Sequence, residues 1–298
     1  MIHRLPVFLF TAFLATACQL AQTQTAPAPS GPQVVLVPPD ELTRSPSLPQ
    51  HSFQQPAAAT NAAALPAQVA KLEAPVASSP AKHAYNSCNV AGPYIAMTFD
   101  DGPHPDLTPK LLDMLKERGI KATFYVIGKN VETYPEIANR IVSEGHEIGN
   151  HSWTHPALSK ISATKVKSEL DQTTQAIVTA TGKRPPTMRP PYGATNATLN
   201  RTIDEQFGMK VIMWSVDPQD WKYRDSERVA AQIIENTKPG SIVLAHDIHK
   251  TTVAAMPKTL DALKAKGFQF VTVSELLAMD LPIEVAKKEA SPSSAPAN

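Results

Sequence analysis

Residues 94–103 read Tyr-Ile-Ala-Met-Thr-Phe-Asp-Asp-Gly-Pro, and the fold prediction starts from this stretch. The apolar run 94–99 predicts a buried strand, and Gly102 and Pro103 predict that it stops there. Asp-Gly-Pro is ordinary turn chemistry, so the pair Asp100 and Asp101 alone is also compatible with a simple turn. Two adjacent carboxylates have no packing use at the carboxyl end of a buried strand, however. They are typical of a catalytic site.

Downstream of this strand, short apolar runs alternate with amphipathic segments. Further strands are predicted over 122–127, 146–150, 210–215, 241–245 and 268–273. Helices are predicted over 108–118, 132–143, 162–181, 198–207, 226–236 and 253–266. Strict alternation of strands and helices indicates an α/β domain with a mainly parallel sheet. Periodicity does not separate a barrel from an open, doubly wound sheet.

The unusual polar residues follow predicted strands. They are Asp100, Asp101, His151, Asp217, Asp220 and His246. In parallel α/β barrels, active sites are built at the face formed by the carboxyl ends of the strands. Polar residues scattered over a surface would not be sorted in this way, so the sequence predicts a functional site at that face.

His151 and His155 have the spacing that places two imidazoles on one side of a helical turn. An isolated pair of this kind is more often two surface histidines. Together with a carboxylate from another strand end, however, the pair gives three ligands and an open position, as in catalytic zinc sites. The same ligand set also fits non-haem iron, so ligand type alone does not choose the metal.

Five segments in order carry a family resemblance: 98–103 (TFDDGP), 151–155 (HSWTH), 189–193 (RPPYG), 217–221 (DPQDW) and 244–247 (LAHD). The chain resembles the polysaccharide deacetylases of the NodB-homology type, the fourth carbohydrate esterase family. The resemblance covers roughly residues 94–279. It implies a distorted (β/α) barrel of about seven parallel strands, and an enzyme that removes N-acetyl groups from N-acetylglucosamine units of a polysaccharide.

The resemblance implies a metal centre and a base. It assigns Asp101, His151 and His155 as ligands of a divalent ion, usually zinc, which lowers the pKa of bound water towards 7. Asp100 is then the general base. Arg189 is expected to hold the Asp100 carboxylate by a charge-assisted contact that a guanidinium can make through two hydrogen bonds.

The resemblance also implies an acid and a substrate pocket. It assigns His246 as the general acid that protonates the departing amine, with Asp220 paired to it and raising its pKa. It places the backbone N–H of Tyr192 at the oxyanion, and Trp221 and Leu244 at the walls of the acetyl pocket.

Three further polar residues lie in or next to these segments. Asp217 is expected to brace either Arg189 or its own loop, and Asp247 to cap the following turn. His249 is expected at the surface.

Peptidoglycan is the favoured substrate, because the chain has a secretion signal and residues 246–252 look like those of wall-acting bacterial members. Chitooligosaccharides and acetyl-xylan are the alternatives within the family. A glycan-binding lipoprotein without turnover is the alternative from another class. Every residue that the family uses for metal binding and proton transfer is present in this sequence, which favours an enzyme.

The 298 residues carry a net charge of +1 and no basic stripe interleaved with aromatic residues, so nucleic acid is not indicated. The 28 prolines are unevenly spread. Residues 26–87 are rich in Pro, Ala, Gln and Ser and are predicted to be disordered. The predicted organisation is a signal peptide (1–17), a linker (18–90), a catalytic domain (91–280) and a disordered tail (281–298). No obligate protein partner is indicated.

The first residues predict export. A short positive start precedes the apolar run 5–17, which is too short to span a bilayer as a mature helix. Residues 14–18 (Leu-Ala-Thr-Ala-Cys) resemble a bacterial lipobox, with Cys18 as the lipidated residue, although Leu14 stands one place early. Ala-Thr-Ala at 15–17 alternatively gives an ordinary signal peptidase site. We therefore expect a periplasmic or envelope location with a lipid anchor. If Cys18 is lipidated, Cys88 has no partner; a Cys18–Cys88 disulfide is the alternative.

Overall fold

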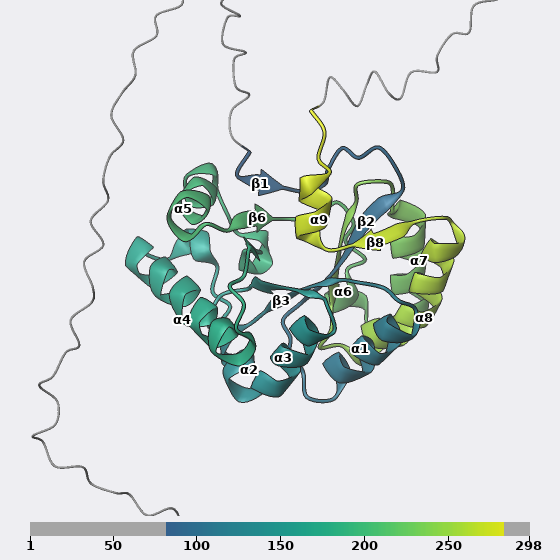
Figure 1. Ribbon diagram of the computed structural model, residues 1–298, viewed down its shortest axis with the longest axis horizontal. Helices are drawn as coiled ribbons and strands as arrows, with labels where there is room; N and C mark the ends of the chain where they lie inside the picture. Colours follow the sequence, from purple (N-terminus) through teal and green to yellow (C-terminus); the bar gives the residue numbers. More distant parts are fainter. Residues whose placement is uncertain (1–81, 283–298) are drawn as a thin grey trace, which may run out of the picture. The chain divides into compact units, whose positions relative to one another are not determined.

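The structure is a computed structural model that describes residues 82–282 (Figure 1). The predictions for the signal peptide, for Cys18 and for most of the linker and tail lie outside the described residues. Between residues 82 and 282, no helix has the length and apolarity needed to cross a membrane.

The sheet has eight strands, and every strand pair is parallel. The strands are β1 (Ala84–Tyr85), β2 (Tyr94–Asp100), β3 (Thr123–Val126), β4 (Glu147–Asn150), β5 (Thr187–Met188), β6 (Lys210–Ile212), β7 (Ile242–His246) and β8 (Gln269–Val271). Their order is β1-β6-β5-β4-β3-β2-β7, with β8 also paired to β2. The predicted parallel α/β architecture is confirmed.

Two single bridges join the edges of this sheet. Val216, just beyond β6, forms a parallel bridge to Val243 of β7, and Ser87, just beyond β1, forms an antiparallel bridge to Ser241. The strands therefore curve round into an irregular barrel rather than an open doubly wound sheet. The barrel has one strand more than the expected seven.

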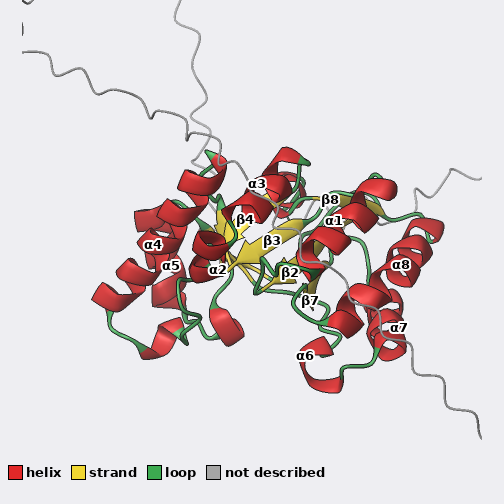
Figure 2. Ribbon diagram, turned by 90° about the horizontal axis from the view of Figure 1, so that it is seen from below, coloured by secondary structure: helices red, strands yellow, loops and turns green. Residues whose placement is uncertain are grey.

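Helices fill the connections between the strands and cover the outside of the sheet. In the described residues they are α1 (Leu107–Glu117), α2 (Gly128–Thr133), α3 (Pro135–Ser143), α4 (Ala163–Thr181), α5 (Ala197–Phe207), α6 (Asp220–Tyr223), α7 (Ser226–Asn236), α8 (Lys250–Ala265) and α9 (Val273–Ala278), with the short 3-10 turns η2 (Leu158–Lys160) and η3 (Pro191–Gly193). Figure 2 shows the strands at the centre, with α4 and α5 on one side and α7 and α8 on the other. The predicted helix 132–143 is two helices, because Pro135 disfavours helical backbone at Tyr134, which has φ −130°.

The pleat of β2 decides which of its side chains reach the barrel interior. One set of alternate residues packs with the helices in the main hydrophobic core: Ile95, Met97 and Phe99. The other set is Ala96, Thr98 and Asp100. Ala96 joins a separate buried cluster with residues of β3, β6 and β7. Because side chains alternate along a strand, Asp100 is on this same inward face.

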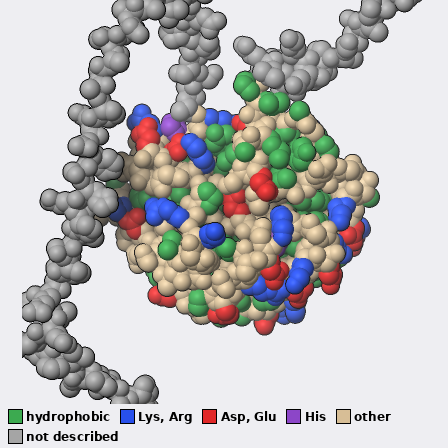
Figure 3. All heavy atoms as spheres, viewed as in Figure 1, with side chains coloured by type: hydrophobic (Ala, Val, Ile, Leu, Met, Phe, Trp, Pro, Cys, Tyr) green, Lys and Arg blue, Asp and Glu red, His purple; other side chains and the backbone are tan. Residues whose placement is uncertain are grey.

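Lysine, arginine, aspartate and glutamate side chains are interspersed on the face shown in Figure 3. This mixture is consistent with the near-neutral composition of the chain. It offers no basic stripe of the kind that nucleic acid would require on that face.

The folded domain begins earlier than the predicted boundary at residue 91. The carbonyls of His83 and Tyr85 accept hydrogen bonds from Val211 of β6 and from Met213 just beyond it, at 3.1 and 2.8 Å. The Cys88 amide donates to Gly240, and Cys88 is buried. A two-residue strand is too short to show an alternating pattern, so this part of the linker prediction is wrong.

Removing β1 should therefore destabilise the domain. A chain that starts at Ala91 loses the backbone hydrogen bonds of His83, Tyr85 and Cys88, each worth about 1 kcal/mol. We expect its free energy of unfolding to be about 2–4 kcal/mol lower than that of a chain starting at Lys82. Urea unfolding of the two chains measures this difference. Equal midpoints and slopes would show that β1 contributes nothing.

Candidate active site

A cavity of about 450 Å³ opens at the carboxyl ends of the strands. The lining includes every predicted active-site residue except Arg189 and Asp220, and consists of Asp100, Asp101, His151, His155, Pro190, Tyr192, Gly193, Trp214, Asp217, Trp221, Leu244 and His246. These residues come from strand ends and loops spread over much of the domain. The parallel direction of the strands places them on one face, as predicted.

Asp101, His151 and His155 form a group that could hold a metal ion. Asp101 Oδ1 lies 3.4 Å from His151 Nε2 and 3.3 Å from His155 Nε2. Zinc bonds of about 2.0–2.1 Å in tetrahedral geometry separate two ligand atoms by roughly 3.3–3.4 Å. Asp101 Oδ1 is also buried and accepts no hydrogen bond from the described residues. The three side chains therefore fit a divalent ion of this size.

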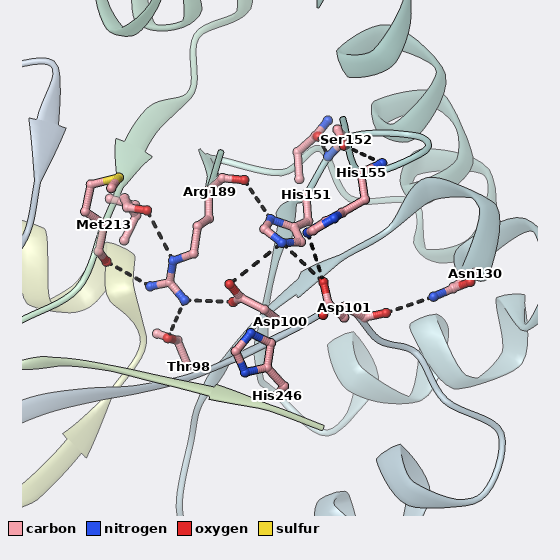
Figure 4. A network of polar contacts seen from close by, with 12 residues as sticks. Thr98, Asp100, Asp101, Asn130, His151, Ser152, His155, Arg189, Met213 and His246 are labelled. Carbon is pink, nitrogen blue, oxygen red and sulfur yellow. Dashed lines mark hydrogen bonds and ion pairs between the residues drawn. The ribbon is translucent and has the colours of Figure 1, made fainter. Parts of the chain in front are cut away.

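A hydrogen bond fixes the orientation of the His151 ring. Its Nδ1 lies 2.7 Å from the backbone carbonyl oxygen of Arg189 and must carry the proton, because a carbonyl only accepts. Nε2 is then left with its lone pair directed at Asp101 and His155 (Figure 4). Metal-binding histidines are commonly oriented by such a bond from the other ring nitrogen.

The segment 151–155 is not the helical turn that its spacing suggested. His151 directly follows β4, and the segment contains no helix. Ser152 and His155 have positive φ angles of 65° and 61°, and Asp101 has a φ of 74°. Such backbone is uncommon for residues other than glycine and persists only where surrounding contacts hold it. The two imidazoles converge because of the loop conformation, not because of helical periodicity.

The ionisation of Asp101 and His155 suits metal binding. Burial opposes the charge on Asp101, but its contacts with His151 prevail and lower its pKa to about 2. Burial, with the neighbouring His151, lowers the pKa of His155 below its ordinary value. Asp101 is therefore a carboxylate and His155 a neutral imidazole at neutral pH, which are the forms that bind metals.

Arg189, at the end of β5, is fully buried and crosses the inside of the barrel. Its Nη1 donates to Asp100 Oδ1 and to Thr98 Oγ1, both at 2.7 Å. Its remaining bonds go to backbone carbonyls of Ile212 and Met213. The predicted contact with Asp100 is present, as one hydrogen bond rather than two.

Asp220 and His246 form a second pair on the other side of the cavity. Asp220 Oδ1 lies 2.8 Å from His246 Nδ1, and Asp220 Oδ2 accepts hydrogen bonds from the His246 amide and from Thr252 Oγ1. Burial disfavours the charged imidazole, but the bond to Asp220 and the attraction of its charge outweigh this effect and raise the pKa of His246 to about 9. His246 is therefore protonated at neutral pH.

The predicted pocket residues lie around the same cavity. Tyr192 has a φ of 60°, is 72% exposed, and packs edge-on against the His155 ring at 4.5 Å. Trp221 is half-exposed and Leu244 is buried, and both line the cavity with His246. The walls are therefore apolar where they surround the polar centre.

The structure also shows the contacts of Asp217, Asp247 and His249. Asp217 accepts the Gln219 amide at 2.7 Å and so braces its own loop. Asp247 does not cap a turn: it is fully buried and accepts the hydroxyl of Thr108, and burial raises its pKa to about 7. His249 is half-buried and its ring lies 5.7 Å from that of His246, so it is not simply a surface residue.

Two contributors were not identified from the sequence. Trp214 lines the cavity, and its ring lies 5.7 Å from the Arg189 guanidinium. Thr98 shares the Arg189 Nη1 group with Asp100. Thr98 stands two residues before Asp100 on β2, so strand alternation alone would have placed both on one face.

Comparisons with known proteins show a family match. Residues 88–212 match the family described as polysaccharide deacetylase. A peptidoglycan-N-acetylglucosamine deacetylase of Listeria monocytogenes is 46% identical over 189 residues, covering 63% of this chain but 40% of the relative. One from Bacillus cereus is 40% identical over 188 residues, covering 61% of this chain and 87% of the relative. The solved structure of the peptidoglycan deacetylase PdaC from Bacillus subtilis has a TM-score of 0.59 and 39% identity, covering 66% of this chain and 93% of the solved chain.

The Asp220–His246 pair yields a prediction that needs no substrate. Asp220→Asn keeps a hydrogen-bond acceptor but removes the charge, so the pKa of His246 should fall from about 9 towards 6.5. Titration of the His246 ring protons by NMR measures this change. In the parent, the stability contributed by the raised pKa is fully present below about pH 6.5 and is lost as the pH rises through about 9. An unchanged His246 titration in the variant would contradict the assignment.

Proposed function

This chain belongs to the polysaccharide deacetylase family, and from that premise we propose that it is a metal-dependent hydrolase that removes N-acetyl groups from N-acetylglucosamine units of peptidoglycan. The observation that carries the proposal is the cavity in which a three-ligand group faces a protonated histidine. The chain spans less than half of the Listeria relative, so the activity is proposed for the described domain.

Asp101, His151 and His155 would hold the metal ion. When bound there, the ion would lower the pKa of a water molecule and polarise the acetyl carbonyl. We propose zinc, because the ligand separations fit tetrahedral coordination and amide hydrolysis needs no redox chemistry.

Asp100 would act as the general base. Its Oδ1 is held by Arg189, while Oδ2 lies 3.8 Å from His151 Nε2 and so points at the metal ligands. A carboxylate fixed in this direction can accept a proton from a water molecule that attacks the acetyl carbon. Arg189 itself is out of reach of the substrate, because it is fully buried, and it would therefore orient Asp100 rather than bind the sugar.

His246 would act as the general acid. Its Nδ1 is bonded to Asp220, and because the ring is protonated, its Nε2 proton is available for the departing amine. Trp221 and Leu244 would surround the acetyl methyl group. The backbone N–H of Tyr192, which lies at the cavity, would stabilise the oxyanion.

Peptidoglycan is proposed over chitooligosaccharides and acetyl-xylan. The support comes from the relatives in Listeria, Bacillus cereus and Bacillus subtilis, which are named for peptidoglycan. A glycan-binding protein without turnover is disfavoured, because the ligands, the base and the acid all meet at one cavity.

The apolar start of the chain and the sequence 14–18 support a further proposal about location. We propose export across the bacterial inner membrane and retention in the envelope by a lipid on Cys18. A lipid anchor would keep the domain close to its polymeric substrate.

Acetate release from a panel of substrates tests the function. The full chain, supplied with zinc, should release acetate faster from peptidoglycan than from chitooligomers or acetyl-xylan. Chelation, or His151→Ala, should abolish release, because the metal group loses its ion or a ligand. A His151→Ala protein that retained one metal ion per chain and normal turnover would contradict the ligand assignment. Faster release from another polymer would reassign the substrate.

The role of His246 predicts a difference between leaving groups. His246→Ala should lower kcat/KM for amides by about 10²–10⁴-fold and have much less effect on an activated ester, whose leaving group departs without a proton. In the parent, amide hydrolysis should decline as the pH rises through about 9, where His246 loses its proton. Steady-state rates on both substrates across pH provide the measurement. Equal losses on both would remove His246 from the role of acid.

A further inference from the structure

One buried carboxylate outside the cavity holds the loop that carries both histidine ligands. Glu169 of α4 is only 4% exposed. Its Oε2 accepts the backbone N–H groups of Trp153 and Thr154 at 2.9 and 2.7 Å, and its Oε1 accepts the Thr154 hydroxyl at 2.7 Å. The bonded residues lie between His151 and His155 in the chain. Glu169 therefore acts on the short connection that sets the separation of the two imidazoles.

The opposite side of the same loop is held by α2. The carbonyls of Ser152 and Trp153 accept hydrogen bonds from the amides of Gly128 and Lys129, at 3.0 and 3.3 Å. The Trp153 ring packs directly against Gly128, where an added Cβ would lie 2.3 Å from a ring carbon. The donors of the loop thus face Glu169 and its acceptors face α2, so the loop cannot shift as a unit without breaking bonds on one side.

A second side chain supports the loop at its beginning. Asn150 Oδ1 accepts the Ser152 amide at 2.8 Å, while Asn150 Nδ2 donates to the carbonyl of Leu170 and to Thr174 Oγ1. One stretch of α4, from Glu169 to Thr174, is therefore bonded to the loop both directly and through Asn150. These bonds help to hold the positive φ angles at Ser152 and His155.

The position of Glu169 on α4 shows that it is not there for packing. The helix buries a stripe at helical spacing that includes Val166, Leu170, Thr173 and Ile177. Glu169 lies on this stripe, where an apolar side chain would bury surface without the cost of desolvating a charge. A carboxylate is useful there because it satisfies two loop N–H groups at once.

We propose that Glu169 is a positioning residue that holds His151 and His155 at the separation from Asp101 that a metal ion requires. The residue does not touch the ion or the substrate. It has this role only if the metal site proposed above exists, so the test must measure metal binding separately from turnover. Partners that orient metal ligands typically change metal affinity by about 10–100-fold when removed.

Four substitutions in the full chain separate the possibilities. Glu169→Ala removes all three bonds. Glu169→Gln keeps a carbonyl oxygen for the two N–H groups and places an NH₂ group where it can donate to the Thr154 hydroxyl. Thr154→Val removes one bond only. Asp171→Asn is the control, because Asp171 is on the same helix but is about half-exposed and, among the residues that the structure describes, pairs only with Lys167.

The zinc dissociation constant is measured by competition titration, with the melting temperature of each zinc-free protein alongside. We expect Glu169→Ala to raise the Kd by about 10–100-fold, Glu169→Gln and Thr154→Val to raise it less but measurably, and Asp171→Asn to leave it unchanged. The cobalt-loaded Glu169→Ala protein should show altered visible absorption, because displaced histidines change the ligand geometry.

Two outcomes would overturn the proposal in different ways. If Glu169→Ala bound zinc with the parental Kd and melted at a lower temperature, Glu169 would only stabilise the fold. If the parent itself did not bind zinc, the metal site would be wrong and this role with it. If Glu169→Ala fails to fold, the Kd values of Glu169→Gln, Thr154→Val and the control still test the proposal. Equal Kd values in all three would count against it.

Discussion

The buried ion pair of Arg189 and Asp100 is the constraint on which the rest of the site depends. A guanidinium without exposure to water must have its charge balanced and its N–H groups bonded, and Arg189 meets this need with Asp100, Thr98 and two carbonyls of the β6 region. Its own carbonyl accepts the His151 ring N–H. One residue therefore joins strands β5, β2 and β6 and orients both a candidate base and a metal ligand. Removing either charged partner would leave the other buried and unpaired, at a typical cost of about 3–5 kcal/mol.

The two histidines at the cavity differ in the group that accepts their ring N–H. Both use Nδ1 as a donor and leave Nε2 facing the cavity. The acceptor for His151 is a neutral carbonyl, which fixes the tautomer without favouring a positive charge. The acceptor for His246 is the buried carboxylate of Asp220, which favours the imidazolium and raises the pKa. The identity of the acceptor thus distinguishes the candidate metal ligand from the candidate proton donor.

The parallel α/β architecture could be predicted from the sequence, because strand-like and helix-like segments alternate along the chain. The site could be predicted because polar residues follow the buried strands. Sequence reasoning missed β1, since two residues show no periodicity. It placed the histidines on a helical turn, because spacing says nothing of the positive φ angles at Ser152 and His155, which contacts from α2 and α4 help to hold. The burial of Asp247 and its hydrogen bond with Thr108 also could not be predicted from the sequence, since the two residues come together only through tertiary folding. Glu169 could have been noticed in the sequence, because it is an acidic residue on the buried stripe of α4.

The two ends of the described domain lie together at the pole opposite the cavity. Lys82 pairs with Asp280, and the Leu281 amide donates to Asn89, near the amino ends of the strands. A mechanical load applied through these ends would act first on the Lys82–Asp280 pair and on the β1–β6 ladder. The load would also reach the cavity, because Met213 both donates to Tyr85 and accepts a hydrogen bond from Arg189. Since Arg189 also holds Asp100, pulling on the two ends would disturb the candidate base as well as the fold.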